Sequence, residues 1–122
     1  TLLPQGVDLL KVDVEGYEGQ VLDGAERLLR EHRPVLFLEL HPAAIAAPHS
    51  VDGIVERLAP LYPDLAAYAP ADQRRSSEKL AARYLPGAAV RRVEDLAALL
   101  ADCRGGDRNE PFWLVARPPA DR

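Results

Sequence analysis

LLKVDVEGYE, residues 9–18, is an apolar run with one lysine that ends in two acids and a glycine. The wider segment 7–14 is short and nearly continuous in apolar residues, which is typical of a strand covered on both faces in a parallel sheet. Gly16 allows the backbone to turn sharply from this strand into a helix. The stretch therefore predicts a buried strand with Asp13 and Glu15 at its carboxyl end.

A helical period follows this strand. One apolar stripe is formed by Tyr17, Val21, Ala25, Leu28 and Leu29. We expect a kink at Gly24 and an end to the helix at residues 32–34, where a proline follows a histidine and an arginine. Residues 35–40, VLFLEL, form a second apolar run of strand length. The first 42 residues therefore predict a βαβ unit with parallel strands and a right-handed crossover.

The rest of the chain continues this alternation less regularly. We expect a helix over 51–61 with Ser50 as its N-cap, a short strand over 65–68, an exposed loop over 72–78, a helix over 93–103 and a strand over 112–116. Residues 80–90 permit no assignment. The order of elements indicates an α/β domain with helices packed against a mostly parallel sheet.

Bulk composition excludes several classes of protein. The 122 residues suit one domain, and the 48% hydrophobic content supports a core. A net charge of −4 gives no reason to expect nucleic acid or an anionic membrane as partner. No apolar stretch approaches the roughly 20 residues of a membrane span. Cys103 is the single cysteine, which excludes an internal disulfide and fits a reducing, cytoplasmic location.

Ionisable residues gather at the ends of the two predicted strands, where open α/β sheets bind ligands. The first strand presents Asp13 and Glu15, and the second presents Glu39 and His41. Lys11 shares a face with Asp13 because side chains alternate along a strand. We expect these five groups to converge on one edge of the sheet, with Lys11 and Glu39 paired across the strands.

Each of these residues also has a purely structural explanation. Asp13 suits a helix cap, and Glu15 suits a solvated acid in the first helical turn. Lys11 and Glu39 suit a structural ion pair, and His41 suits an ordinary loop histidine. Spacing alone therefore predicts an acidic site at the strand ends and names no reaction.

The segment VDLLKVDVEGYEGQVLDGAERLL, followed by RPVLFLELHP, resembles the FkbM family of methyltransferases. That family carries a run of the form D-L-L-K-I-D-V-E-G-x-E-x-x-V-L-x-G-A and then a strand that begins with proline and ends in glutamate. The resemblance covers residues 7–42. The matching residues are Asp8, Leu9, Leu10, Lys11, Asp13, Val14, Glu15, Gly16, Glu18, Val21, Leu22, Gly24, Ala25, Arg33, Pro34 and Glu39.

The resemblance implies a Rossmann-like fold of three layers, with a seven-stranded sheet whose last strand is antiparallel. On that template residues 7–14 are the fourth strand, 34–40 the fifth, and 112–116 the seventh, placed between the fifth and the sixth. The template's glycine-rich cofactor loop has no counterpart, because the sequence contains no G-x-G. We therefore expect residues 1–118 to be the C-terminal half of a class I methyltransferase domain, inactive alone, and 119–122 to be a tail.

The resemblance also implies methyl transfer from S-adenosylmethionine to a small-molecule hydroxyl, on a sugar or another secondary metabolite. The implied catalytic residues are Asp13, His41, Glu39 and Lys11, and the implied cofactor-binding residues are Asp13, Glu15 and Gly16. Asp13 contacts the acceptor or the amine of the cofactor, and His41 or Glu39 removes the hydroxyl proton. Lys11 lowers the pKa of the acceptor hydroxyl or pairs with Glu39.

Three alternatives remain open at this stage. A methyltransferase of this fold can instead hold a divalent ion, here with Asp13, Glu39 and His41, although Mg²⁺ prefers carboxylates and water to histidine. We therefore assign no metal ligand from the sequence. A metal-dependent hydrolase would use the same residues together with Glu15, without a strong ligand spacing to support it. A non-catalytic scaffold or interaction domain would retain the βαβ unit alone.

Overall fold

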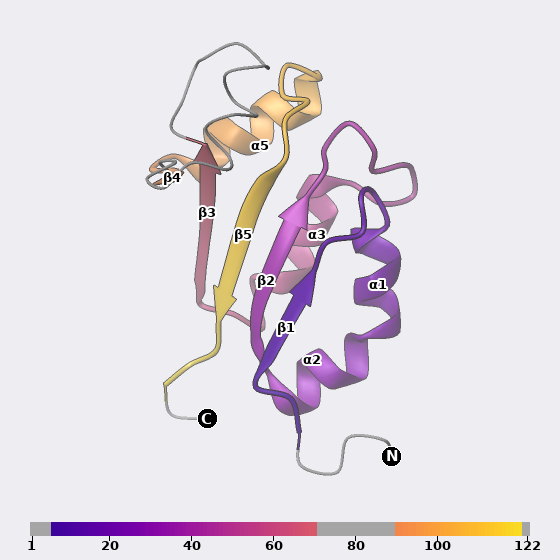
Figure 1. Ribbon diagram of the computed structural model, residues 1–122, viewed down its shortest axis with the longest axis vertical. Coiled ribbons are helices and arrows are strands. Elements are labelled where there is room, and N and C mark those ends of the chain that lie inside the picture. The colour runs from indigo at the N-terminus through magenta and orange to yellow at the C-terminus, as the bar shows by residue number, and fades with distance from the viewer. Residues whose placement is uncertain (1–5, 71–89, 121–122) are drawn as a thin grey trace, which may run out of the picture.

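A computed structural model of the chain describes residues 6–70 and 90–120 (Figure 1). The helices are α1 (Glu18–Gly24), α2 (Glu26–His32), α3 (Val51–Leu58) and α5 (Leu96–Gly105), and the strands are β1 (Leu9–Val12), β2 (Val35–Leu40), β3 (Asp64–Pro70), β4 (Val90–Arg92) and β5 (Phe112–Arg117). The loop expected over 72–78 lies outside the described residues. Within the described ranges, no helix has the length and apolarity needed to cross a membrane.

The five strands form one sheet in the order β1-β2-β5-β3-β4. β1 and β2 are parallel neighbours, which confirms the βαβ unit. β5 lies between β2 and β3 and is antiparallel to both, which confirms the place expected for the last strand. The expectation of a mostly parallel sheet is wrong, because β4 is also antiparallel to its neighbour and the sheet is mixed.

The first strand is shorter than expected. β1 covers Leu9–Val12 rather than residues 7–14, so the acids follow the strand instead of ending it. The backbone turns just beyond, where Glu15 has a φ of 46° and Gly16 a φ of 106°. This turn leads directly into α1. β2 has the bounds expected for the second strand.

The single kinked helix expected after β1 is two helices. α1 and α2 meet at Ala25, which has a φ of −95° and a ψ of 3°, one residue beyond the expected kink at Gly24. α2 ends at His32, and the C-cap residue Arg33 adopts the left-handed conformation that closes a helix. The apolar stripe is only partly correct, since Tyr17 is 65% exposed whereas Leu22 is fully buried.

The later elements differ mainly at their ends. α3 stops at Leu58 rather than at residue 61, and the Ser50 hydroxyl accepts a hydrogen bond from the Gly53 N–H, which confirms the N-cap. β3 is longer than expected, and β4 forms at the end of the unassigned segment. α5 starts at Leu96 with Asp95 as its N-cap, and not at residue 93.

The core lies between the sheet and the four described helices, which cover one face of the sheet (Figure 1). Leu36, Leu38 and Leu40 of β2 and Leu114 of β5 are fully buried there. Burial of each such side chain contributes roughly 1.5–3 kcal/mol to folding. The alternate residues of the same strands face the other side, so the alternation of a one-sided sheet replaces the two-sided burial expected from the sequence.

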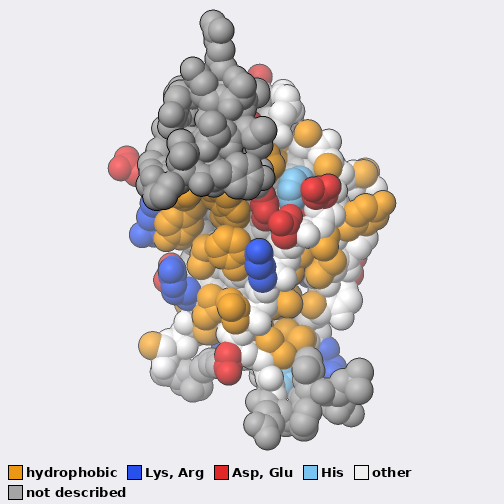
Figure 2. Space-filling view, in the orientation of Figure 1, with side chains coloured by type: hydrophobic (Ala, Val, Ile, Leu, Met, Phe, Trp, Pro, Cys, Tyr) orange, Lys and Arg blue, Asp and Glu red, His pale blue; other side chains and the backbone are white. Residues whose placement is uncertain are grey.

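The other face of the sheet carries an apolar patch (Figure 2). A hollow of about 330 Å³ on this face is lined by Phe37, Tyr68, Val90, Trp113, Val115 and Arg117. The described residues place no helix over it, so the three-layer arrangement expected from the resemblance is not confirmed. Within residues 6–70 and 90–120 the structure shows an α/β arrangement in which the helices form one layer.

A polar contact joins the helices behind the sheet. One Asp23 carboxylate oxygen of α1 accepts a hydrogen bond from the Arg57 guanidinium of α3, and the other lies 3.2 Å from His49 Nε2. The Arg57 hydrogen bond lowers the pKa of Asp23 below its usual value. A depressed pKa means that this contact stabilises the folded state only while Asp23 is ionised.

The Asp23→Asn variant is therefore expected to be less stable than the natural chain at neutral pH. The difference in the free energy of unfolding persists down to the unfolded pKa of about 3.9 and disappears as pH falls through the lower folded pKa. Urea titrations between neutral and acid pH measure it. The exposed acid Glu56 of α3 provides the control, since Glu56→Gln is expected to show no such loss. A pH-independent difference for Asp23→Asn would contradict the linkage.

Candidate functional site

Three ionisable side chains meet at the carboxyl ends of β1 and β2. Val12 pairs with Leu38 in the sheet register, so Asp13 and Glu39, the next residues, lie at the same level, and His41 follows β2. One ligand atom from each of Asp13, Glu39 and His41 lies within 4.8 Å of the other two. Figure 2 shows acidic side chains beside a histidine, next to the apolar patch. We call these three residues the strand-end cluster.

A fourth residue, Glu18 of α1, orients the histidine. The Glu18 side chain is completely buried, and its Oε1 lies 2.5 Å from His41 Nδ1. The same oxygen accepts a hydrogen bond from the Gly16 N–H at 3.2 Å. Because an ionised carboxylate only accepts hydrogen bonds, Nδ1 is the ring nitrogen that carries the proton in this contact. Nε2 is therefore directed toward the other members of the cluster.

His41 Nε2 lies between the two remaining carboxylates. It is 3.7 Å from Asp13 Oδ1 and 3.9 Å from Glu39 Oε1. Both distances exceed the roughly 3.2 Å limit of a good N–H···O hydrogen bond. Nε2 can therefore accept a proton or bind a cation. The carboxylates of Asp13 and Glu39 are close enough to stabilise the protonated ring or the bound cation.

The three side chains of the strand-end cluster differ in their exposure to solvent. The side chains of Glu39 and His41 are 9% and 15% exposed, whereas that of Asp13 is 41% exposed. Buried carboxylates are costly unless a positive charge or hydrogen bonds compensate them. The cluster thus has two shielded members, Glu39 and His41, and an acid at its mouth that solvent and ligands can reach.

The structure brings together only part of the set expected from the sequence. Lys11 is exposed and pairs with Phe37 in the sheet register, and among the described residues no ion pair joins it to Glu39. The expected Lys11–Glu39 pair is therefore wrong: Lys11 faces Phe37 and points to solvent, and Glu39 lies two residues further along β2. Glu15 is exposed in the turn beyond β1 and is not a member of the cluster.

Two structural explanations offered for these residues are also settled. Asp13 does not cap α1, since Tyr17 is the N-cap residue and no side chain caps it. His41 is not an ordinary loop histidine, because it contacts three carboxylates. Sequence reasoning missed the role of Glu18, which it named as a residue that matches the family pattern and not as a site residue. The available signal was the acid that follows Glu15 at a spacing of three in E-G-Y-E.

Gly16 makes the turn that holds this site together. A Cβ at this position would lie 2.6 Å from the Ala44 carbonyl oxygen, and the φ of 106° is one that side chains rarely adopt. The glycine therefore lets the turn after β1 pack directly on the loop that follows His41. The sharp turn expected from the sequence is confirmed, and the contact with Ala44 is new.

Gly16→Ala is expected to lower the free energy of unfolding by about 1–3 kcal/mol through backbone strain, and the contact with Ala44 adds to this loss. Urea denaturation measures the change. Gly24→Ala is the matched control, because a Cβ there meets nothing within 4 Å. Since alanine is the better helix former, this control is expected to gain about 0.5–1 kcal/mol. Equal changes in the free energy of unfolding for the two substitutions would show that Gly16 does not adopt this strained, closely packed turn in solution.

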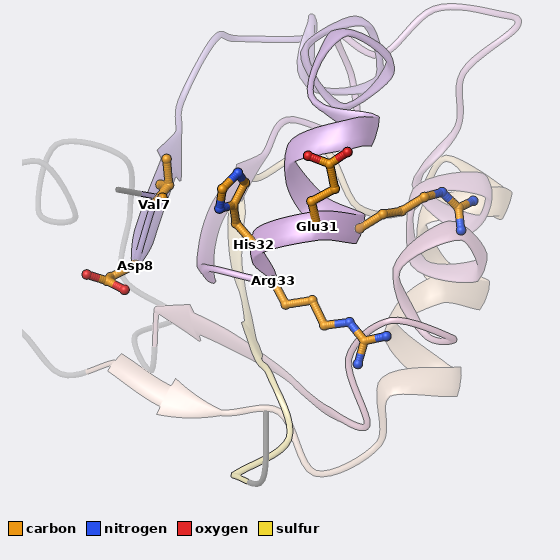
Figure 3. A pocket seen from close by; sticks show the side chains of 7 residues that line it. Val7, Asp8, Glu31, His32 and Arg33 are labelled. Atoms are coloured by element: carbon orange, nitrogen blue, oxygen red, sulfur yellow. The ribbon is translucent and has the colours of Figure 1, made fainter. Parts of the chain in front are cut away.

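A larger hollow, of about 480 Å³, lies at the opposite end of β1 and β2 (Figure 3). Its lining includes residues 6–8 and 30–33, which precede the two strands. Figure 3 shows the side chains of Asp8, His32 and Arg33 directed apart rather than toward one point. The strand-end cluster, which together with Glu18 brings four ionisable groups to one place, is therefore the better candidate site.

Comparison with protein families identifies the chain. The model of the methyltransferase FkbM domain matches residues 2–68, more than half of the 122 residues. The chain belongs to the FkbM methyltransferase family. No curated protein and no solved structure matches it. The FkbM match contains Asp13, Glu18, Glu39 and His41, and it ends within β3.

Proposed function

We propose that this FkbM chain forms the acceptor side of an S-adenosylmethionine-dependent methyltransferase that methylates a hydroxyl of a small molecule, on a sugar or another secondary metabolite. The observation that carries the proposal is the buried Glu18 carboxylate that holds the ring of His41 at 2.5 Å. A non-catalytic scaffold has no need of this arrangement, since buried charged groups cost stability. Proton removal from a hydroxyl needs a positioned base, and here the carboxylate of Glu18 positions the imidazole of His41.

The chain's own residues supply the acid–base chemistry. The acceptor hydroxyl lies against Asp13, the exposed member of the cluster, and its proton passes to His41 Nε2 as the oxygen attacks the methyl carbon. Glu18 stabilises the positive charge that the ring then carries, as a carboxylate does beside a catalytic histidine. Glu39, which is largely buried beside the ring, adds a second negative charge. The proton is finally released to solvent.

The cofactor-binding residues expected from the sequence fit only in part. The exposed carboxylates of Asp13 and Glu15 suit the positive charges of S-adenosylmethionine, which supplies an electrophilic methyl group when bound. Gly16 offers it no space, because Ala44 occupies the position next to it. Since the sequence also lacks a G-x-G loop, we propose that residues outside this chain hold the rest of the cofactor.

The test is an assay of methyl transfer by the natural polypeptide that contains this chain. Radiolabelled S-adenosylmethionine is incubated with sugars and other hydroxylated metabolites, alongside analogues in which the hydroxyl is replaced by hydrogen. We expect label in the hydroxylated compounds only, and a loss of activity in Asp13→Asn. Asp64→Asn, at the amino end of β3, is the control. Label in the deoxy analogues, or full activity of Asp13→Asn, would overturn the proposal.

A further inference from the structure

We infer that Asp13, Glu39 and His41 bind one divalent transition-metal cation, with His41 Nε2 as the nitrogen ligand. The binding itself follows from geometry and is independent of any methyl transfer. Its role in catalysis rests on the function proposed above. The ligands come from the carboxyl ends of two adjacent parallel strands, so the backbone of the sheet fixes their spacing.

The spacing of the three side chains suits a single ion. Bonds of about 2.0–2.2 Å to an ion place neighbouring ligand atoms roughly 3.0–3.5 Å apart. Nε2 lies 3.7 Å from Asp13 Oδ1 and 3.9 Å from Glu39 Oε1, and all three ligand atoms lie within 4.8 Å. Small side-chain rotations bring these atoms to coordination distance. The exposed side of Asp13 leaves room for water or a substrate oxygen to complete the coordination.

The orientation of His41 is the second observation. Histidines that bind metals usually donate their other ring N–H to a carboxylate, which fixes the ring and makes it a stronger ligand. Glu18 occupies that position at Nδ1. If Nε2 carried a proton instead, it would need an acceptor within about 3.2 Å, and both carboxylates lie further away. With the proton on Nδ1, Nε2 directs its lone pair toward the two acids, which is the state that a metal ligand requires.

The set of ligands selects the kind of ion. One imidazole and two carboxylates suit Zn²⁺, Mn²⁺ or Fe²⁺, whereas Mg²⁺ and Ca²⁺ prefer oxygen ligands alone. The imidazole of His41 therefore favours a transition metal over Mg²⁺. Mn²⁺ is the most useful probe, because its electron paramagnetic resonance changes on binding.

A bound cation alters one step of the proposed chemistry. A cation held by Asp13, Glu39 and His41 would act as a Lewis acid on the acceptor hydroxyl, so that its proton would leave to solvent as the oxygen takes the methyl group from sulfur. His41 Nε2 is then a metal ligand and not the base. The residues are the same, and the cation does the work assigned above to the histidine.

The experiment is an Mn²⁺ titration of the chain after treatment with a chelator, followed by electron paramagnetic resonance, with Zn²⁺ as competitor. We expect one ion per chain and a spin-echo modulation from one imidazole nitrogen. His41→Ala removes the modulation. His41→Ala and Asp13→Asn each weaken binding by at least about tenfold, and Glu18→Gln, which alters a positioning residue, weakens it by about 10–100-fold. His32→Ala, at the other end of the sheet, leaves binding unchanged (Figure 3).

Each outcome decides between defined alternatives. Absence of binding for both Mn²⁺ and Zn²⁺, or unchanged affinity in His41→Ala, overturns the metal site. Circular dichroism of Asp13→Asn, an exposed position, shows whether lost binding reflects lost folding. Methyl transfer by a chelated, metal-free polypeptide would reject the cation and retain His41 as the base. Metal binding without methyl transfer to any hydroxyl would retain the site and reject the proposed function.

Discussion

Replacement of His41 by alanine lowers the rate of methyl transfer by the natural polypeptide by about 10²–10⁴-fold, the usual contribution of a positioned acid–base group. The loss arises because Nε2 lies between Asp13 and Glu39, at 3.7 and 3.9 Å, and no other described side chain presents a nitrogen there. The effect is expected in kcat, with KM changed little. The imidazole either removes the reacting proton or binds the cation that activates the hydroxyl, and both roles affect the chemical step. Steady-state kinetics with the identified acceptor measures it.

His32→Ala provides the matched control for this result, since it removes the same side chain at the amino end of the sheet. Its kcat and KM are expected to equal those of the natural polypeptide. Urea denaturation of His41→Ala separates loss of catalysis from loss of folding. A stable His41→Ala protein with full kcat would show that the strand-end cluster is not the catalytic centre.

Replacement of Glu18 by alanine is expected to lower the free energy of unfolding by about 3–5 kcal/mol, as for other buried charged partners. The Glu18 side chain is completely buried, and its Oε1 accepts hydrogen bonds from His41 and from the Gly16 N–H. The substitution leaves both donors without their acceptor and opens a cavity. Most domains have a total stability of only about 5–15 kcal/mol, so this variant is expected to be near its threshold of folding.

Glu18→Gln tests the same contact more gently. The glutamine keeps the size of the side chain and one acceptor oxygen, so the stability loss is expected to fall to about 1–3 kcal/mol. Activity is still expected to fall, because a neutral amide stabilises a charged ring less than a carboxylate does. Urea titration gives the stability, and the methyl-transfer assay gives the activity.

Glu31→Ala is the control for both Glu18 variants. Glu31 is exposed and makes an i,i+4 ion pair with Arg27 at 3.4 Å, which is worth at most about 0.5 kcal/mol. An equally small loss for Glu18→Ala would mean that the buried contact with His41 does not form in solution.

Local elements follow closely from local residues. The mostly apolar six-residue run of β2, the Ser50 N-cap of α3 and the end of α2 before Pro34 are all visible in the sequence, because each depends on neighbours within a few positions. The resemblance to the FkbM family added what spacing did not contain, namely the antiparallel place of β5 between β2 and β3. Errors concentrated at element ends, where the length of β1 depends on the turn at Glu15 and Gly16.

The candidate site divides in the same way. The order of residues was enough to put acids and a histidine at the ends of two strands, since the alternation of side chains along a strand is a local property. Which of these side chains meet depends on how the strands and helices pack. The register of β1 against β2 put Asp13 level with Glu39 and left Lys11 beside Phe37. The packing of α1 placed Glu18 against His41, 23 residues away in the chain. Such contacts depend on how elements dock, because burial and register are set by the whole sheet and not by the neighbours of any one residue.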